Sequence, residues 1–107
     1  MSGSNGPDYS SSGGGSSGTD CSGYRNEKPL QAPNEDVVPT LSVGEDLYLA
    51  LRKNPVLVIA VITADGREAG SIMPDVLLIS CLQQGVAYTA TVRSIRGGHI
   101  MLAIAAQ

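Results

Sequence analysis

The chain has 107 residues, a formal net charge of −3 at pH 7 and only 4% aromatic residues. This acidic balance argues against a dedicated duplex-binding protein, which usually presents a strongly basic face. No segment reaches the ~20 consecutive apolar residues of a membrane-spanning helix, and the N-terminus lacks the basic region and apolar run of a signal peptide. We therefore expect a soluble, cytoplasmic protein.

Residues 1–36 are predicted to lie outside the folded core. The first 29 residues contain no Leu, Ile, Val or Phe, and 15 of the first 24 are Ser or Gly. Such a segment cannot bury enough apolar surface to offset the roughly 1–2 kcal/mol per residue that ordering a backbone costs. We expect a disordered Ser/Gly-rich tail that leads into a proline-containing, extended connector. Residues 37–107 hold enough aliphatic side chains for one small domain.

Three strands are predicted at the start of this domain. Residues 43–52 alternate, with their leucines on one face, as in a half-buried strand. Residues 56–63 form a β-branched run that indicates a strand buried on both faces. Asp65-Gly66 supplies positive φ angles for a tight hairpin turn into a strand over residues 67–72. Within that strand, Gly70 indicates a bulge or a close-packing point.

A short helix is predicted over residues 73–85. Pro74 suits the first turn, Asp75 complements the helix dipole, and Gly85 can end the helix. The side chains expected to form its buried stripe are Val76, Leu78, Ile79 and Leu82.

Two further strands, over residues 86–95 and 99–105, are predicted around a Gly-Gly turn. The complete order is β-β-β-α-β-β, which predicts a mainly β fold. Because the chain has no Phe or Trp, interlocked aliphatic side chains must form the core, and this favours a closed or nearly closed sheet. We expect a small β-barrel with one short helix.

No residue pattern indicates an enzyme, a metal site or a cofactor. His99 is the only histidine and lacks an adjacent nucleophile and carboxylate. Cys81 falls late in the predicted helix, where the dipole disfavours a thiolate, so it is interpreted as a small core residue. Whether Cys81 pairs with Cys21 is left open by the sequence. The acidic pairs Glu35-Asp36 and Glu45-Asp46 lack the ligand spacing of a calcium loop.

A small basic site is the remaining candidate. Arg52 and Lys53 end a predicted strand just before Asn54, while Arg93 and Arg96 flank the last hairpin. If the barrel brings them together, they form a nucleic-acid-binding pocket, and Tyr48 or Tyr88 is available to stack on a base. The alternative is that isolated basic residues only solvate the surface and that the tyrosines cover the edge of the core.

The order of residues over 41–96 resembles the HIRAN domain, a small β-barrel module found alone in bacteria and at the front of some chromatin-remodelling ATPases. The segments that carry the resemblance are Leu41-Ser-Val-Gly44, Asn54-Pro55, Ala60-Val61, Asp65-Gly-Arg-Glu-Ala-Gly70 with Ile72 and Pro74, Leu82-Gln-Gln-Gly85, and Ala87-Tyr-Thr-Ala-Thr-Val92.

This resemblance implies DNA recognition, including recognition of single-stranded 3′ ends, through a pocket near the Asn-Pro segment. Only Asn54 and Pro55 match that pocket directly, with Arg52 and Lys53 as basic neighbours. The family usually places an aromatic residue, an Asp and an Asn after Asn-Pro, whereas this chain has the aliphatic run Val56–Ile59. The groups that would hold a nucleotide are therefore missing from that stretch.

Two functions follow as hypotheses. The first is a non-enzymatic, HIRAN-like module that binds single-stranded nucleic acid through Arg52, Lys53, Asn54, Arg93 and Arg96. The alternative is a protein-interaction or assembly module that uses an exposed strand edge or an apolar patch and binds no nucleic acid.

Overall fold

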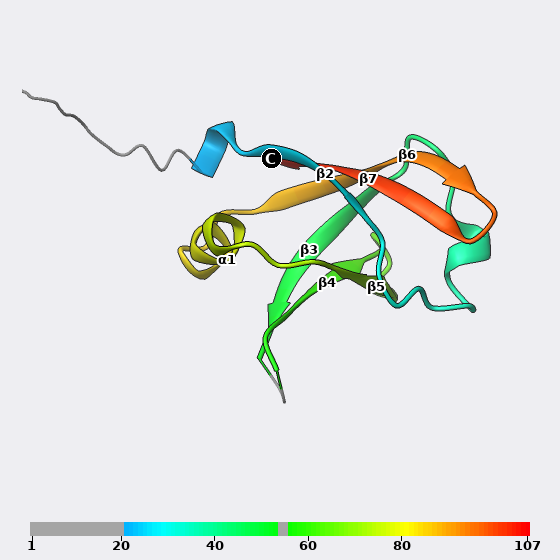
Figure 1. Ribbon diagram of the computed structural model, residues 1–107, viewed down its shortest axis with the longest axis horizontal. Helices are drawn as coiled ribbons and strands as arrows, with labels where there is room; N and C mark the ends of the chain where they lie inside the picture. The colour runs from blue at the N-terminus through cyan, green and yellow to red at the C-terminus, as the bar shows by residue number, and fades with distance from the viewer. Residues whose placement is uncertain (1–20, 54–55) are drawn as a thin grey trace, which may run out of the picture.

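The computed structural model describes residues 21–53 and 56–107, which form one six-stranded antiparallel sheet curled into a half-barrel (Figure 1). The spatial order of the strands is β2-β7-β6-β3-β4-β5. The elements are η1 Cys21–Gly23, β2 Arg25–Pro29, η2 Val38–Thr40, β3 Asp46–Arg52, β4 Val58–Ile62, β5 Glu68–Ile72, α1 Val76–Gln83, β6 Tyr88–Arg96 and β7 His99–Ala106. Across these two ranges, no helix combines the length and the apolar character needed to cross a membrane.

The mainly β fold and the predicted element order are confirmed from β3 to β7. Ile59, Ala60 and Val61 of β4 are fully buried, as the β-branched run indicated for a central strand. The core is predominantly aliphatic, and Tyr24 and Tyr88 are its aromatic members. Interlocked aliphatic side chains thus stabilise the curled sheet, as the absence of Phe and Trp required.

Strand β2 precedes the predicted domain and corrects its N-terminal boundary. It pairs antiparallel with residues 101–105 of β7, although none of its own residues is buried. Tyr24 and Leu30, which flank it, are buried in the core. The polar sequence of β2 has low β propensity, so backbone pairing and these two flanking residues hold it in place. Of the disordered tail and connector expected over residues 1–36, residues 1–20 lie outside the described residues.

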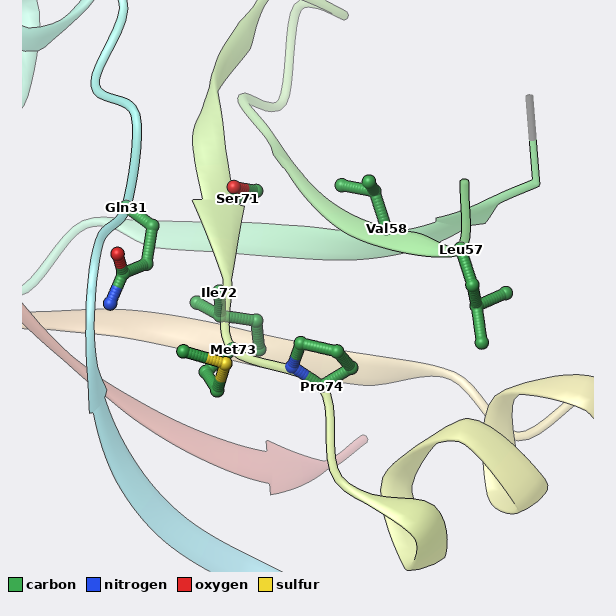
Figure 2. Close-up of a pocket in the computed structure, with 7 residues that line it drawn as sticks. All are labelled: Gln31, Leu57, Val58, Ser71, Ile72, Met73 and Pro74. Atoms are coloured by element: carbon green, nitrogen blue, oxygen red, sulfur yellow. The ribbon is translucent and has the colours of Figure 1, made fainter. Parts of the chain in front are cut away.

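The segment after β2 joins the two edges of the sheet. Leu30 donates its N–H to the carbonyl of Ile100 in β7 at 2.8 Å. The next residue, Gln31, exchanges two backbone hydrogen bonds of 2.7 and 2.9 Å with Ser71 of β5 (Figure 2). At Gly70 a Cβ atom would lie 2.6 Å from the Gln31 carbonyl oxygen, and the β4–β5 register shifts beside it. Both the close-packing point and the bulge predicted there are confirmed.

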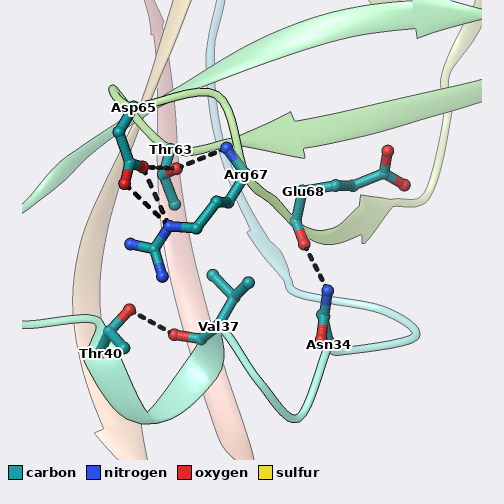
Figure 3. A network of polar contacts seen from close by, with 7 residues as sticks. All are labelled: Asn34, Val37, Thr40, Thr63, Asp65, Arg67 and Glu68. Atoms are coloured by element: carbon teal, nitrogen blue, oxygen red, sulfur yellow. Dashed lines mark hydrogen bonds and ion pairs between the residues drawn. The ribbon is translucent and has the colours of Figure 1, made fainter.

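The hairpin turn between β4 and β5 has three residues, not the two expected from Asp65-Gly66. The Thr63 N–H donates to the Arg67 carbonyl at 2.8 Å, and only Gly66 in this turn has a positive φ, of +91°. This is the three-residue loop in which glycine occupies the left-handed position. Hydrogen bonds from the Thr63 hydroxyl and from Arg67 Nε hold the pKa of the exposed Asp65 carboxyl below its ordinary value (Figure 3).

Helix α1 lies within the predicted range of residues 73–85 but is shorter, and Pro74 precedes it instead of lying in its first turn. Asp75 is the N-cap, and its Oδ1 accepts the Leu78 N–H at 2.7 Å. Gly85, with a φ of +90°, follows the last turn. Leu78 and Cys81 are fully buried, whereas Val76, which was predicted to belong to the buried stripe, is 85% exposed. Val76 is the first helical residue, and the side of α1 that meets the sheet is formed further along the helix.

A disulfide joins Cys21 to Cys81 across 60 residues of sequence, which answers the question that the sequence left open. Cys81 is fully buried in α1, and Cys21 belongs to η1 immediately before β2. The bond therefore fixes η1 to the helix.

Asp75 makes a second connection between the N-terminal segment and α1. Its Oδ2 accepts the Tyr24 hydroxyl at 2.5 Å and lies 3.3 Å from Lys28 Nζ. Burial alone would raise the pKa of Asp75, but hydrogen bonds from Tyr24, the Leu78 N–H and Lys28 outweigh it and lower that pKa. Burial, reinforced by the bond to Asp75, raises the pKa of Tyr24 to about 12.

Candidate nucleic-acid interface

The predicted basic residues do not form one pocket. Tyr48 of β3 lies opposite Thr89 of β6 in an antiparallel pair. Arg52 follows Tyr48 by four residues towards one end of the sheet, and Arg93 follows Thr89 by four residues towards the other. At about 3.4 Å per residue, their Cα atoms are roughly 27 Å apart along the strands. Arg52 also forms an ion pair with Glu68 at 3.2 Å.

The remaining predicted residues divide in the same way. Lys53 follows β3 directly and is exposed near Arg52, and Arg96 ends β6 on the Arg93 side. Asn54, together with Pro55, lies outside the described residues.

The two predicted stacking tyrosines have opposite environments. Tyr88 is only 1% exposed, its hydroxyl donates to the Cys21 carbonyl at 2.6 Å, and its ring packs edge-to-face against Tyr24. The prediction that Tyr88 stacks on a base is therefore wrong. The alternation of Tyr88, Ala90 and Val92 with two threonines already placed it on the apolar face. Tyr48 is 39% exposed and remains available.

A different set of side chains gathers on the outer surface of β2, β7, β6 and β3. Residues opposite each other in antiparallel strands project from the same face. One row across the four strands contains Arg25, Ala105, Thr89 and Tyr48, and the next contains Glu27, Ala103, Thr91 and Asp46. Nearer the β6–β7 turn, Ser94 is opposite Met101 and Arg96 is opposite His99. We call these residues, together with Arg93, the outer face of β7.

Two hollows follow each other along the outer face of β7. The first, of about 310 Å³, is lined by Arg25, Asn26, Glu27, Arg93 and Ala103–Ala105. The second, of about 360 Å³, is lined by Ser94, Arg96, His99 and Met101. They extend from Ala105 to His99, roughly 20 Å along β7. The β6–β7 register shifts at Arg93, and such a bulge redirects the side chain of the extra residue.

The cations of the outer face of β7 have no acidic partner in residues 21–53 and 56–107. Arg25, Arg93 and Arg96 form no salt bridge there, whereas Lys28, Arg52 and Arg67 each do. The face also carries the anions Glu27 and Asp46, and Asp46 accepts the Thr91 hydroxyl at 2.7 Å. Arg25 was not among the predicted site residues, because its neighbours in space come from the opposite end of the chain.

A separate apolar surface lies where β4 begins and β5 ends. Its exposed apolar side chains are Leu57 and Met73. Between them is a hollow of about 180 Å³ lined by Gln31, Leu57, Val58, Ser71, Ile72, Met73 and Pro74 (Figure 2).

The outer edge of β5 is already occupied by the chain itself. Besides the Gln31–Ser71 pair, the Asn34 N–H donates to the Ala69 carbonyl at 2.9 Å. The Asn34 side chain donates to the Glu68 carbonyl at 3.1 Å (Figure 3). A partner strand cannot add to this part of β5 without displacing these bonds.

Within the described ranges, no three His, Cys, Asp or Glu side chains lie together in a group that could hold a metal ion. Comparisons with protein-family models, with curated proteins and with solved structures find no match to this chain.

Proposed function

We propose that this domain is a non-enzymatic module that binds single-stranded nucleic acid across the outer face of β7. The observation that carries the proposal is the placement of Arg25, Arg93 and Arg96. These three arginines lack salt bridges among the described residues and lie beside two consecutive hollows. The resemblance to HIRAN domains supports the same class of ligand, although the site proposed here lies away from Asn54.

The shape of the face suits an unpaired strand. Ala103, Ala105, Thr89 and Thr91 are small, so they leave the surface over β7 low between the arginines. Tyr48 lies at one end of the row that contains Arg25 and is exposed enough to stack on a base. Basic side chains that follow the phosphates and an aromatic side chain that stacks on a base are the usual means of holding single strands without sequence preference.

Charge sets the expected strength of binding. The whole chain has a net charge of −3, and Glu27 and Asp46 lie on the face itself. Binding is therefore expected to be weak and to depend strongly on salt. With three phosphate contacts, log K should fall with log[salt] with a slope of about −2.

The test is a titration of a fluorescent single strand of about ten nucleotides at roughly 50 and 200 mM salt. R25Q and R93Q should each weaken binding about fivefold at low salt and reduce the salt slope by about 0.7. R67Q is the matched control, since Arg67 is paired with Asp65 in the β4–β5 turn. Absence of binding by the unmodified chain at low salt, or equal losses in R67Q and R93Q, would exclude this site.

A protein partner is the second candidate, and the apolar hollow beside Leu57 and Met73 favours it. Clustered exposed apolar side chains are typical of interaction surfaces, and the occupant that fits is an apolar segment of another protein. Val43 and Met73 are 63% and 58% exposed, but of the two only Met73 lines this hollow. Capture of a partner that M73S weakens and V43S does not would support this candidate. Equal capture by both variants would contradict it.

A further inference from the structure

Strand β2 brings Arg25 to the proposed site, but none of its own side chains is buried in the core. Its five residues, Arg25–Pro29, are all exposed or half-buried, and its sequence has little β propensity. It pairs with β7 alone among the strands. The position of Arg25 therefore depends strongly on what holds the chain immediately before it.

The Cys21–Cys81 disulfide is the covalent part of that attachment. It lies four residues before Arg25 and connects η1 to the buried side of α1. The non-covalent contacts nearby are the packing of Tyr24 on Tyr88 and the bonds from Tyr24 and Lys28 to Asp75. Arg93 and Arg96, in contrast, belong to the β6–β7 hairpin, whose eight paired positions do not involve the disulfide.

We propose that the Cys21–Cys81 disulfide controls nucleic-acid affinity by holding β2, and with it Arg25, on the outer face of β7. This inference rests on the proposed function. Two thiol molecules, or one dithiol, reduce the bond by thiol–disulfide exchange. The protein S–S bond breaks, two cysteine thiols form, and the reductant is oxidised to its own disulfide. Residues 21–29 then detach from β7 while the rest of the half-barrel stays folded.

The redox state of the cellular compartment decides how often the Cys21–Cys81 disulfide is reduced. The cytoplasmic location remains a prediction, and in a reducing cytosol disulfides are usually transient or redox-sensing. In an oxidising compartment the bond persists and the site stays complete. The strand-binding face is thus at full strength under oxidising conditions and weakened under reducing ones.

The experiment measures single-strand affinity for the oxidised chain, the reduced chain and the C21S/C81S variant, each with and without R25Q or R93Q. We expect reduction and C21S/C81S each to weaken binding about fivefold, the loss expected from one exposed ionic contact. R25Q should have no further effect on the reduced chain. R93Q should weaken the reduced chain as much as it weakens the oxidised chain.

Amide hydrogen exchange makes the test independent of binding. The proposal expects the amides of β2 to lose protection on reduction while those of β3 and β4 keep it. Unchanged protection of β2, or loss of protection throughout the sheet, would overturn it, as would a reduced chain that still responds to R25Q. If the oxidised chain binds no single strand, the proposed function fails, and exchange at β2 separately decides whether the disulfide holds this strand.

Discussion

Replacing Gly70 with alanine tests how the half-barrel closes. An added Cβ would lie 2.6 Å from the Gln31 carbonyl oxygen and 3.0 Å from Leu30 Cδ1, closer than ordinary van der Waals contact, which begins near 3.4 Å. The first obstacle is backbone, so rotation of a side chain cannot relieve it. To accept the methyl group, the Gln31 carbonyl must move by about 0.8 Å, the difference between 2.6 and 3.4 Å.

The cost of this movement follows from what Gln31 does. Its two backbone hydrogen bonds to Ser71, of 2.7 and 2.9 Å, are the pairing that joins β5 to the segment after β2. Each is worth about 1 kcal/mol net, and overpacking adds about 1–3 kcal/mol. G70A should therefore lower the free energy of unfolding by about 3–5 kcal/mol.

Urea unfolding of the oxidised chain measures this change, and G66A is the matched control. Gly66 has a φ of +91°, but nothing lies within 4 Å of its added Cβ. G66A thus carries only the left-handed backbone strain of about 1–2 kcal/mol. Amide exchange at Ser71 should accelerate in G70A and not in G66A. If G70A is no more destabilised than G66A, the close approach between Gly70 and Gln31 does not limit the packing of the closed sheet.

Three further predictions concern the N-terminal attachment. The C21S/C81S variant should lose about 4 kcal/mol of unfolding free energy, because the bond closes a loop of 60 residues in the unfolded chain; a loss below about 1 kcal/mol in urea titrations would contradict this account. Burial and the bond to Asp75 raise the pKa of Tyr24 from its ordinary value of 10.0 to about 12. The contribution of Tyr24 to the free energy of unfolding should therefore be fully present below pH 10 and should be lost as the pH rises towards 12. Y24F should lack this alkaline loss in pH-dependent melting, and an identical pH profile would refute the assignment. The pKa of Asp75 is lowered, so its effect on stability has the opposite pH dependence. The Asp75 carboxylate stabilises the fold above pH 3.8, its ordinary pKa, and this stabilisation is lost as the pH falls below that value. D75N should flatten that acid limb and lose about 1 kcal/mol at neutral pH through its weaker ionic and capping bonds.

Much of the sheet was determined by local sequence. Alternation and β-branched runs define β3 and β4, because side chains in a strand project to opposite faces in turn. Asp75 and Gly85 bound α1, because an N-cap oxygen and a left-handed glycine satisfy the free backbone groups at the two ends of a helix. Each of these signals acts between residues close together in the chain, so periodicity and turn chemistry are enough to read them.

The tertiary structure alone decided the contacts between segments that are distant in sequence. Strand β2 forms because β7, far along the chain, is available to pair with it. Cys21 and Cys81 are likewise brought together by the folded structure, since 60 residues separate them in sequence. Antiparallel register sends Arg52 and Arg93 to opposite ends of the sheet and places Arg25 beside Arg93 instead. These are pairings between distant segments, whose stability depends on the folded sheet and not on the residues adjacent in sequence. The sequence by itself therefore specified the strands β3 to β7 and the helix, whereas the curled sheet decided which charges share a face.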